Sequence, residues 1–257
     1  MNYIKKNSIV WDRCVENKDG YATWTSPVSP EIIKNARNGK WDVVLTPIKP
    51  VPKSWFPANF KGLKVLLVAG GGGQQGPILS ALGADVTVFD NSRKQLEQDE
   101  FVAKREGLSI KTVQGNMQDL SAFPDETFDF IMQFGGCFVD SVLPVWKEAY
   151  RVLKEGGTML AGHNHPFEFI FDVPEMEKGN LVARFKIPYS DIKDLTPEEF
   201  DQSTAHLGVC FGHSHTDMIQ GQIDAGFLIA GFYEDKGCGY VLDNYIDTFF
   251  ATNAIKL

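Results

Sequence analysis

The stretch Lys64-Val-Leu-Leu-Val-Ala-Gly-Gly-Gly-Gly-Gln-Gln-Gly76 decides the fold of this chain. Its apolar first half is typical of a buried parallel strand. The glycines that follow allow a sharp turn, and they let a ligand approach the backbone without meeting a Cβ atom. The apolar residues Ile78, Leu79 and Leu82 then predict a helix that begins beneath the loop. The strand, the loop and the helix N-terminus together form a crevice that contains backbone N–H groups and the positive end of the helix dipole.

A second apolar run follows and ends at Asp90. A carboxylate in this position can accept hydrogen bonds from both hydroxyls of a ribose. The two features together predict a site for a nucleoside-containing cofactor. Gly71, Gly73 and Gly76 also have the G-x-G-x-x-G spacing of dinucleotide-binding enzymes, which is a weak pattern by itself. An NAD(P)-dependent oxidoreductase is therefore one alternative.

Further strand and helix patterns follow in a regular order. Strand patterns occupy 109–113, 128–132 and 158–161, and an amphipathic helix pattern covers 142–153. In order and spacing, residues 60–165 resemble the class I S-adenosylmethionine-dependent methyltransferases, in the small-molecule subgroup of the ubiquinone and menaquinone biosynthesis C-methyltransferases. The resemblance implies an α/β fold, with a doubly wound, seven-stranded, mostly parallel, Rossmann-like sheet over residues 61–257.

The C-terminal part of the chain supports this resemblance. Residues 227–233 and 240–246 both have strand patterns, and a short connection between them implies antiparallel pairing. A terminal hairpin of this kind is typical of class I methyltransferases and not of nicotinamide dehydrogenases. We therefore predict an enzyme that transfers the sulfonium methyl group of S-adenosyl-L-methionine in line to an acceptor, leaving S-adenosyl-L-homocysteine. A non-enzymatic S-adenosylmethionine-binding protein is a further alternative.

The resemblance also assigns residues to the cofactor site. The glycine loop would approach the methionine part and the ribose, and residues after the second, third and fourth strands would contact the ribose, the adenine and the methionine end. Asn116 replaces a common acidic residue, but its amide oxygen can still accept from the adenine amine. Leu67 replaces the usual acidic residue of the first strand, so we expect Gln75 or a backbone carbonyl to bind the amino group. The predicted set is Ala69, Gly70, Gly71, Gly72, Gly73, Gln75, Asp90, Asn91, Asn116, Met117, Gln133 and Phe134.

Four of the five histidines form two H-x-H pairs, His163/His165 and His213/His215. A pair on one strand would share a face and could bind a metal. The first pair leads into a turn, however, and Ser214-His-Thr-Asp217 resembles a capping box, so we expect no metal. His213 falls where related methyltransferases often have a histidine, which makes it the candidate general base for the acceptor. A histidine at a capped helix start, without a catalytic role, is the alternative.

Residues 1–60 lie outside the core pattern. They carry Trp11, Trp24, Trp41 and Trp55, together with prolines that prevent long helices. One interpretation is a segment that wraps the sheet and buries its tryptophans in the core. The other is a lid that closes over the active site, and both can hold.

An insert at 164–212 follows the fifth strand. Alternation over 181–187 predicts a strand, and Thr196-Pro-Glu-Glu predicts a helix start. In this superfamily such insertions usually build the acceptor pocket, so we expect substrate specificity here. A purely structural excursion is the alternative.

Composition favours a small-molecule acceptor over a nucleic acid. The net charge of −8 lacks the basic footprint that a nucleic-acid substrate requires. Four cysteines without C-x-x-C spacing are typical of reduced thiols. We find no apolar run of membrane-spanning length and no signal-peptide core, so we expect a cytoplasmic enzyme without membrane insertion. No pattern indicates the acceptor or the oligomeric state.

Overall fold

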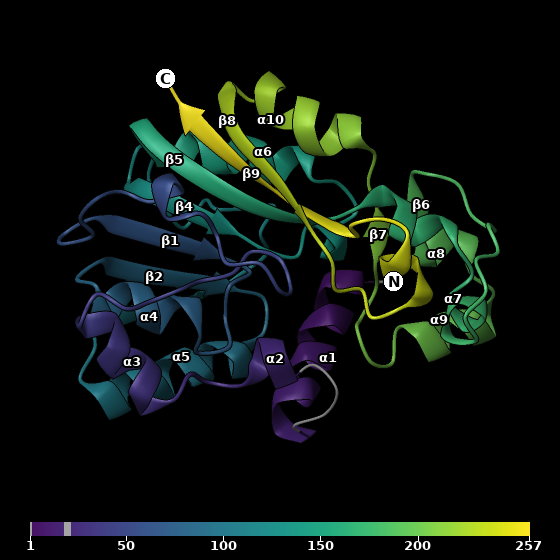
Figure 1. Cartoon of the computed structure of the whole chain (residues 1–257), viewed down its shortest axis with the longest axis horizontal. Coiled ribbons are helices and arrows are strands. Elements are labelled where there is room, and N and C mark those ends of the chain that lie inside the picture. The colour runs from purple at the N-terminus through teal and green to yellow at the C-terminus, as the bar shows by residue number, and fades with distance from the viewer. Residues whose placement is uncertain (1, 18–21) are drawn as a thin grey trace.

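A seven-stranded sheet forms the centre of the molecule, in the order β3-β2-β1-β4-β5-β9-β8 (Figure 1). The computed structural model describes residues 2–17 and 22–257. The strands are β1 Lys64–Val68, β2 Asp85–Asp90, β3 Ile110–Gln114, β4 Phe128–Gln133, β5 Leu153–Asn164, β8 Phe227–Asp235 and β9 Phe249–Lys256. Strands β1 to β5 pair in parallel, whereas β9 is antiparallel to both β5 and β8. The predicted fold, including its antiparallel last strand, is confirmed.

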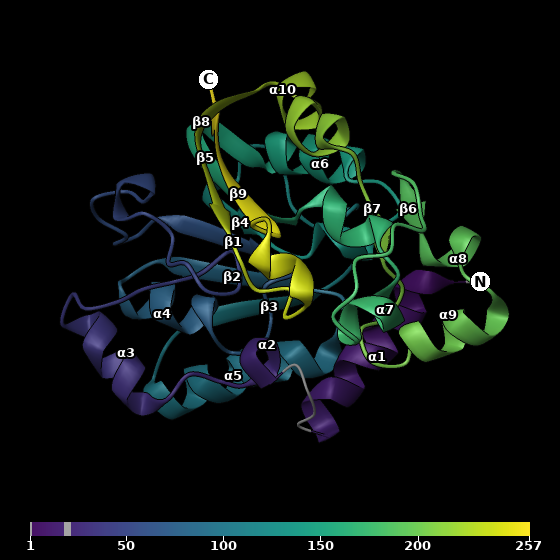
Figure 2. The same cartoon turned by 45° about the vertical axis from the view of Figure 1, so that its right-hand side comes forward.

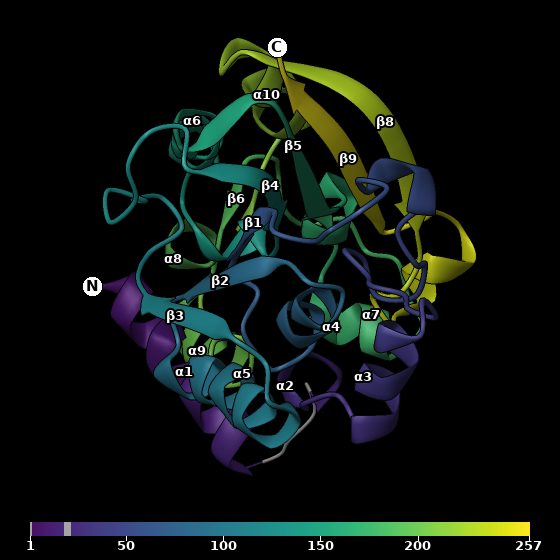
Figure 3. The same cartoon turned by 90° about the vertical axis from the view of Figure 1, so that its left-hand side faces the viewer.

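Helices cover both faces of this sheet (Figure 3). One face carries α3 Pro30–Arg37, α4 Gln75–Ala81 and α5 Arg93–Glu106, and the other carries α6 Leu143–Val152 and α10 Gly221–Asp224. Successive side chains of β1 point to opposite faces, so Leu67 packs with Leu79 and Leu96 while Leu66 packs with Trp146. Burial on both faces explains why β1 is an unbroken apolar run.

The C-terminal hairpin differs from its prediction. Residues 240–246 contain the short 3-10 helix η5 Val241–Asn244 instead of a strand, and the last strand begins only at Phe249. The carboxylate of Asp243 explains the difference, because it accepts hydrogen bonds from the N–H groups of Gly237 and Gly239 and from the hydroxyl of Thr248. These bonds close the segment into a compact loop, and the connection between β8 and β9 is longer than predicted.

The insert forms a lobe of short elements beside the carboxyl ends of the parallel strands, drawn in green in Figure 1. With the segment that leads to α10, it comprises η3 Pro166–Ile170, α7 Val173–Glu177, β6 Tyr189–Ser190, α8 Asp191–Asp194, α9 Pro197–Ser203, β7 Phe211–Gly212 and η4 Thr216–Gln220. The predicted helix start is confirmed by a capping box between Thr196 and Glu199. The strand predicted at 181–187 is wrong. Most of these side chains are exposed, and Arg184 forms ion pairs with Asp172 and Glu199 instead of extending a sheet.

A helix that the sequence pattern did not predict, α1 Tyr3–Asn17, lies between α5 and the insert lobe (Figure 2). It precedes the prolines of the N-terminal segment, which continues through α2 Ala22–Thr25 and η1 Lys53–Trp55. The buried side chain of Asn7 fixes α1. Its amide donates to the carbonyl oxygens of Phe138 and Val209, and its oxygen accepts from the N–H of Val209.

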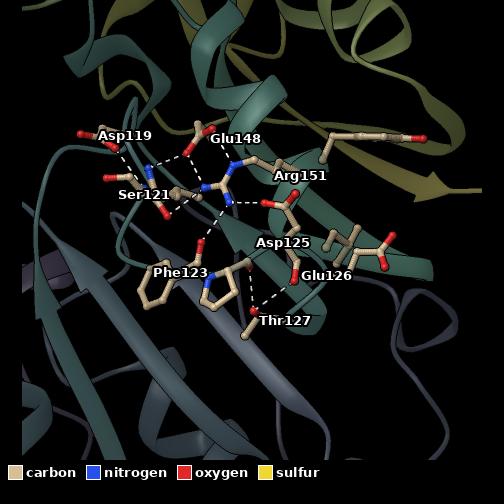
Figure 4. A network of polar contacts seen from close by, with 12 residues as sticks. Asp119, Ser121, Phe123, Asp125, Glu126, Thr127, Glu148 and Arg151 are labelled. Atoms are coloured by element: carbon tan, nitrogen blue, oxygen red, sulfur yellow. Dashed lines mark hydrogen bonds and ion pairs between the residues drawn. The ribbon is translucent and has the colours of Figure 1, made fainter.

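The connection between β3 and β4 is held by Arg151 of α6 (Figure 4). The guanidinium donates to the carbonyl oxygens of Leu120 and Phe123 at 3.0 and 2.9 Å. It also pairs with Asp125 and Glu148, both at 2.7 Å, and these partners raise the pKa of Arg151. Arginine suits such a site because its planar fork donates several bonds at once. The network positions the loop that begins directly after β3.

We expect Asn7→Ala to destabilise the protein by about 1 to 3 kcal/mol, because it leaves buried backbone groups of Phe138 and Val209 unpaired. Urea unfolding followed by circular dichroism measures this loss. The control is Asn17→Ala, which changes an exposed asparagine of the same helix. Equal stability of the two variants would show that Asn7 does not fix α1.

Candidate cofactor and acceptor site

The glycine loop after β1 is joined to the end of β2 by the carboxylate of Asp90. One carboxylate oxygen accepts from the N–H of Gly71 at 3.0 Å, and the other accepts from the N–H of Ser92 at 2.8 Å. A Cβ atom on Gly71 would lie 3.1 Å from the Asp90 oxygen and 2.8 Å from the Cβ of Gln95. Burial raises the pKa of Asp90 to about 6, against the opposing effect of the N–H donors.

A second carboxylate, that of Asp99 in α5, holds the next turn of the loop. It is fully buried, and one of its oxygens accepts from the N–H groups of Gly72 and Gly73, each at 3.1 Å. Burial raises the pKa of Asp99 well above its usual value. Sequence reasoning missed this residue, although Asp99 has helical spacing from the buried Leu96 and Val102 and so falls on the apolar face of α5.

The N–H groups of Gly71, Gly72 and Gly73 all donate to acceptors within the protein. A dinucleotide-binding loop instead presents free N–H groups to a pyrophosphate. The loop therefore has the glycine spacing of a dinucleotide site without its free donors, which argues against the oxidoreductase alternative.

A cavity of 1210 Å³ extends from the glycine loop to the insert lobe. Nine of the twelve predicted cofactor residues line it: Ala69, Gly70, Gly71, Gln75, Asp90, Asn91, Asn116, Met117 and Phe134. Gly72, Gly73 and Gln133 are not among its lining residues. Gln133 is fully buried and donates to the carbonyl of Phe134 at 2.6 Å. The structure thus brings most of the predicted set together around one cavity.

The polar groups on this wall fit a nucleoside. The two oxygens of Asp90 accept from the N–H groups of Gly71 and Ser92, and a carboxylate has further lone pairs that can accept from ribose hydroxyls. The amide oxygen of Asn116 accepts from the N–H of Gln118 at 3.3 Å and retains a second lone pair for an adenine amine. Met117 and Phe134 are nearly buried and offer apolar surface to a ring.

His213 occupies a different environment from the one its predicted role suggests. It is buried, and a ring nitrogen lies 3.1 Å from the carbonyl oxygen of Gly136. Burial lowers the pKa of His213, and the residue is not among those that line the cavity. The next residues exchange capping hydrogen bonds, from the Asp217 N–H to the Ser214 hydroxyl and from the Ser214 N–H to the Asp217 carboxylate. The role of His213 as a general base stays a prediction.

His165 and His215, one from each predicted pair, contact each other. A ring nitrogen of His165 lies 3.3 Å from one of His215, and burial lowers the pKa of His165 to about 4. His163 stacks on Phe250 with ring centroids 4.6 Å apart. These contacts account for the ring positions by packing and hydrogen bonding within the protein.

One part of the N-terminal segment wraps the core, and another part lies at the cavity, where a lid would lie. Trp41 packs edge-on against Phe56 and Phe60, with ring centroids 5.1 and 5.5 Å apart, and so belongs to the core. Trp11 and Trp24 instead line the cavity. Residues 1 and 18–21 of the segment lie outside the described residues. Closure of the segment as a lid stays a prediction.

Comparison with known proteins identifies the family. A family model described as Methyltransferase domain matches residues 66–161. The protein named Uncharacterized methyltransferase YbaJ, of Bacillus subtilis (strain 168), is 51% identical over 256 residues, which are 99% of this chain and 98% of that protein. The chain belongs to the class I S-adenosylmethionine-dependent methyltransferases.

Two more distant matches agree with this family. The methyltransferase resembles the demethylmenaquinone methyltransferase of Geobacillus sp. (strain WCH70), with 35% identity over 130 residues, 46% of this chain and 55% of that protein. A crystal structure of an S-adenosylmethionine-dependent methyltransferase from Mesorhizobium loti has the same fold, with a TM-score of 0.60 and 16% identity over 79% of this chain and 94% of that one. The protein is a methyltransferase, and its cofactor is S-adenosyl-L-methionine.

We expect Asp99→Ala to weaken S-adenosylhomocysteine binding and to lower the free energy of unfolding by about 1 to 3 kcal/mol, because it removes the carboxylate acceptor of the Gly73 N–H and leaves the Gly72 N–H with only the Gln95 carbonyl. Calorimetric titration and urea unfolding measure the two effects. Asp201→Ala, which removes an exposed helical carboxylate, is the control. Binding and stability equal to wild type would remove Asp99 from the support of the loop.

Proposed function

We propose that this methyltransferase acts on a small-molecule acceptor, which binds in the part of the cavity that the insert 164–212 lines. The observation that carries the proposal is the continuity of the cavity, which reaches from Asp90 to Phe169 and Tyr189. Its volume of 1210 Å³ exceeds the range of about 300 to 1,000 Å³ typical of a site for one small ligand. The space therefore suits a cofactor and a small acceptor together. The net charge of −8 supports a small molecule over a nucleic acid.

We further propose which residues hold the cofactor. Asp90 and Asn91 would bind the ribose, Asn116 and Met117 the adenine, and the glycine loop with Gln75 the methionine part. S-adenosylmethionine supplies a methyl group on a positively charged sulfur, which is a good leaving group. The residues of the cavity hold both reactants in one orientation, and such positioning can contribute about 7 to 11 kcal/mol to the rate. Aromatic side chains exclude water from the transfer site.

The N-terminal segment closes the cavity in this proposal. The carbonyl oxygen of Trp24 lies 2.5 Å from the position that a Cβ of Gly72 would take, and the N–H of Val28 donates to the carbonyl of Gly73 at 2.9 Å. On α1, the carbonyl of Ile4 accepts from the side chain of Asn91 at 2.7 Å. The segment thus contacts both the glycine loop and a proposed ribose-binding residue.

We also propose a cytoplasmic location. All four cysteines belong to the described residues and none is joined in a disulfide, as is usual for thiols in that reducing compartment. Within residues 2–17 and 22–257, no helix combines the length and the apolar character needed to cross a membrane.

Asp90→Asn tests the ribose contact. We expect it to weaken S-adenosylhomocysteine binding about 10- to 100-fold, because it removes a charge-assisted hydrogen-bond acceptor. In the wild type, affinity should fall as the pH drops through about 6, where the Asp90 carboxylate becomes protonated, and the variant should lose this dependence. Calorimetry over a range of pH measures both effects. Asp85→Asn, at the other end of β2, should bind like wild type; an unchanged dissociation constant in Asp90→Asn would remove Asp90 from the site.

Hydrogen exchange tests the lid. We expect the amides of residues 22–30 to exchange more slowly when S-adenosylhomocysteine is bound, because the ligand lies beneath them. Mass spectrometry of the free and bound protein measures the change, and the peptide covering β9 is the internal control. Exchange that is equally slow without ligand would assign the segment a structural role.

An acceptor screen tests the activity itself. Compounds are incubated with the enzyme and S-adenosylmethionine, and release of S-adenosylhomocysteine is scored. We expect turnover with small organic acceptors and none with RNA or DNA. Turnover confined to nucleic acids would contradict the proposed acceptor class.

A further inference from the structure

Glu168 is an unusual carboxylate in the acceptor part of the cavity. It lies in η3, directly after β5, and it is partly buried on the cavity wall. Within residues 2–17 and 22–257, its carboxylate accepts one hydrogen bond, from the side-chain amide of Asn164 at 2.8 Å. Among the described residues, no lysine, arginine or histidine forms an ion pair with it.

Two other carboxylates on the cavity wall, Glu199 and Asp191, have stronger partners. Glu199 pairs with Arg184 at 2.7 Å. Asp191 accepts from the Tyr189 hydroxyl and from the Cys210 N–H, both at 2.7 Å. Because a partly buried carboxylate is costly without a cation or several donors, Glu168 has more capacity for a further partner than Glu199 or Asp191.

The groups that face Glu168 are acidic or neutral. Burial is the main cause of the raised pKa values of Tyr240 and Cys238, and the nearby Glu168 carboxylate raises both further. It also adds to the raised pKa of Cys210, after larger effects from Cys137 and burial. Asp243 lies on the same side and, after burial, contributes to a pKa of about 7 for Glu168, which the Asn164 bond opposes. No charge in this set neutralises the carboxylate.

Aromatic side chains line the same cavity, and Tyr240 lies near enough to Glu168 for the carboxylate to raise its pKa. Phe169, Phe171, Tyr240 and Phe249 line it together with Glu168. Faces of aromatic rings attract cations through their negative quadrupole, and a carboxylate attracts them by charge. Such a combination binds an ammonium group and leaves apolar surface for the rest of the molecule.

We propose that Glu168 binds the ammonium group of the methyl acceptor, which makes the acceptor a small amine with an aromatic or apolar body. The inference rests on the proposed function and adds the chemical class of the acceptor. Glu168 acts here as a specificity-determining residue that binds the acceptor.

Calorimetry on the enzyme saturated with S-adenosylhomocysteine tests the proposal. Phenethylamine and tryptamine are compared with their neutral counterparts, phenethyl alcohol and tryptophol. We expect the amines to bind, and to bind more tightly than the alcohols. Glu168→Gln should weaken amine binding about 10- to 100-fold and leave binding of the alcohols and of S-adenosylhomocysteine unchanged. Glu155→Gln, an exposed glutamate at the far end of β5, should bind like wild type.

The wild type provides a second measurement that needs no variant. Because the carboxyl of Glu168 has a pKa of about 7, amine affinity should rise as the pH increases through that value and the group ionises, while alcohol affinity stays constant. Alcohols that bind as tightly as amines, amine binding unaffected by Glu168→Gln, or no binding of either amine would overturn the proposal. If any of these outcomes occurs while the wild type still binds S-adenosylhomocysteine, the proposed function stands and only the acceptor class is wrong. If the wild type does not bind S-adenosylhomocysteine at all, the proposed function is contradicted as well.

Discussion

Hydrogen bonds from the backbone of the glycine loop to two buried carboxylates determine the geometry of the site. Asp90 at the end of β2 and Asp99 in α5 accept from three successive glycine N–H groups. These bonds fix the spacing between β1, β2 and α5, and the cavity wall is built on that spacing. Both carboxylates have raised pKa values because burial disfavours their charge. Holding the loop therefore carries the electrostatic cost of burying two carboxylates, and the packing of the surrounding core offsets this cost.

The central part of the fold could be predicted from the sequence because its pattern is uninterrupted. Strands buried on both faces read as continuous apolar runs, and the glycine loop and Asp90 mark the ends of the first two. The reason for the glycines was predicted less well. We expected them to leave room for a ligand, but a Cβ on Gly71 would meet Gln95 and Asp90, and one on Gly73 would meet the carbonyl of Gln98. Close packing of the protein against itself therefore requires these glycines.

The remaining parts depend on contacts between residues far apart in the chain. Residues 240–246 have a strand pattern, yet Asp243 folds them into a loop. The alternation at 181–187 does not reflect burial, since most of these side chains are exposed. Helix α1 is fixed by Asn7, whose partners lie in other parts of the chain. Glu168 gave no signal in the sequence, because its surroundings come from β5 and from the connection between β8 and β9.

The central claim is that the glycine loop and Asp90 form a site for S-adenosylmethionine at one end of a cavity that also holds the acceptor. The most direct measurement is a calorimetric titration of the wild-type enzyme with S-adenosylhomocysteine and, separately, with NAD. Our account predicts saturable binding of S-adenosylhomocysteine at one site per chain and no binding of NAD, since the loop amides are already occupied by Asp90 and Asp99. Saturable binding of NAD without binding of S-adenosylhomocysteine would contradict it.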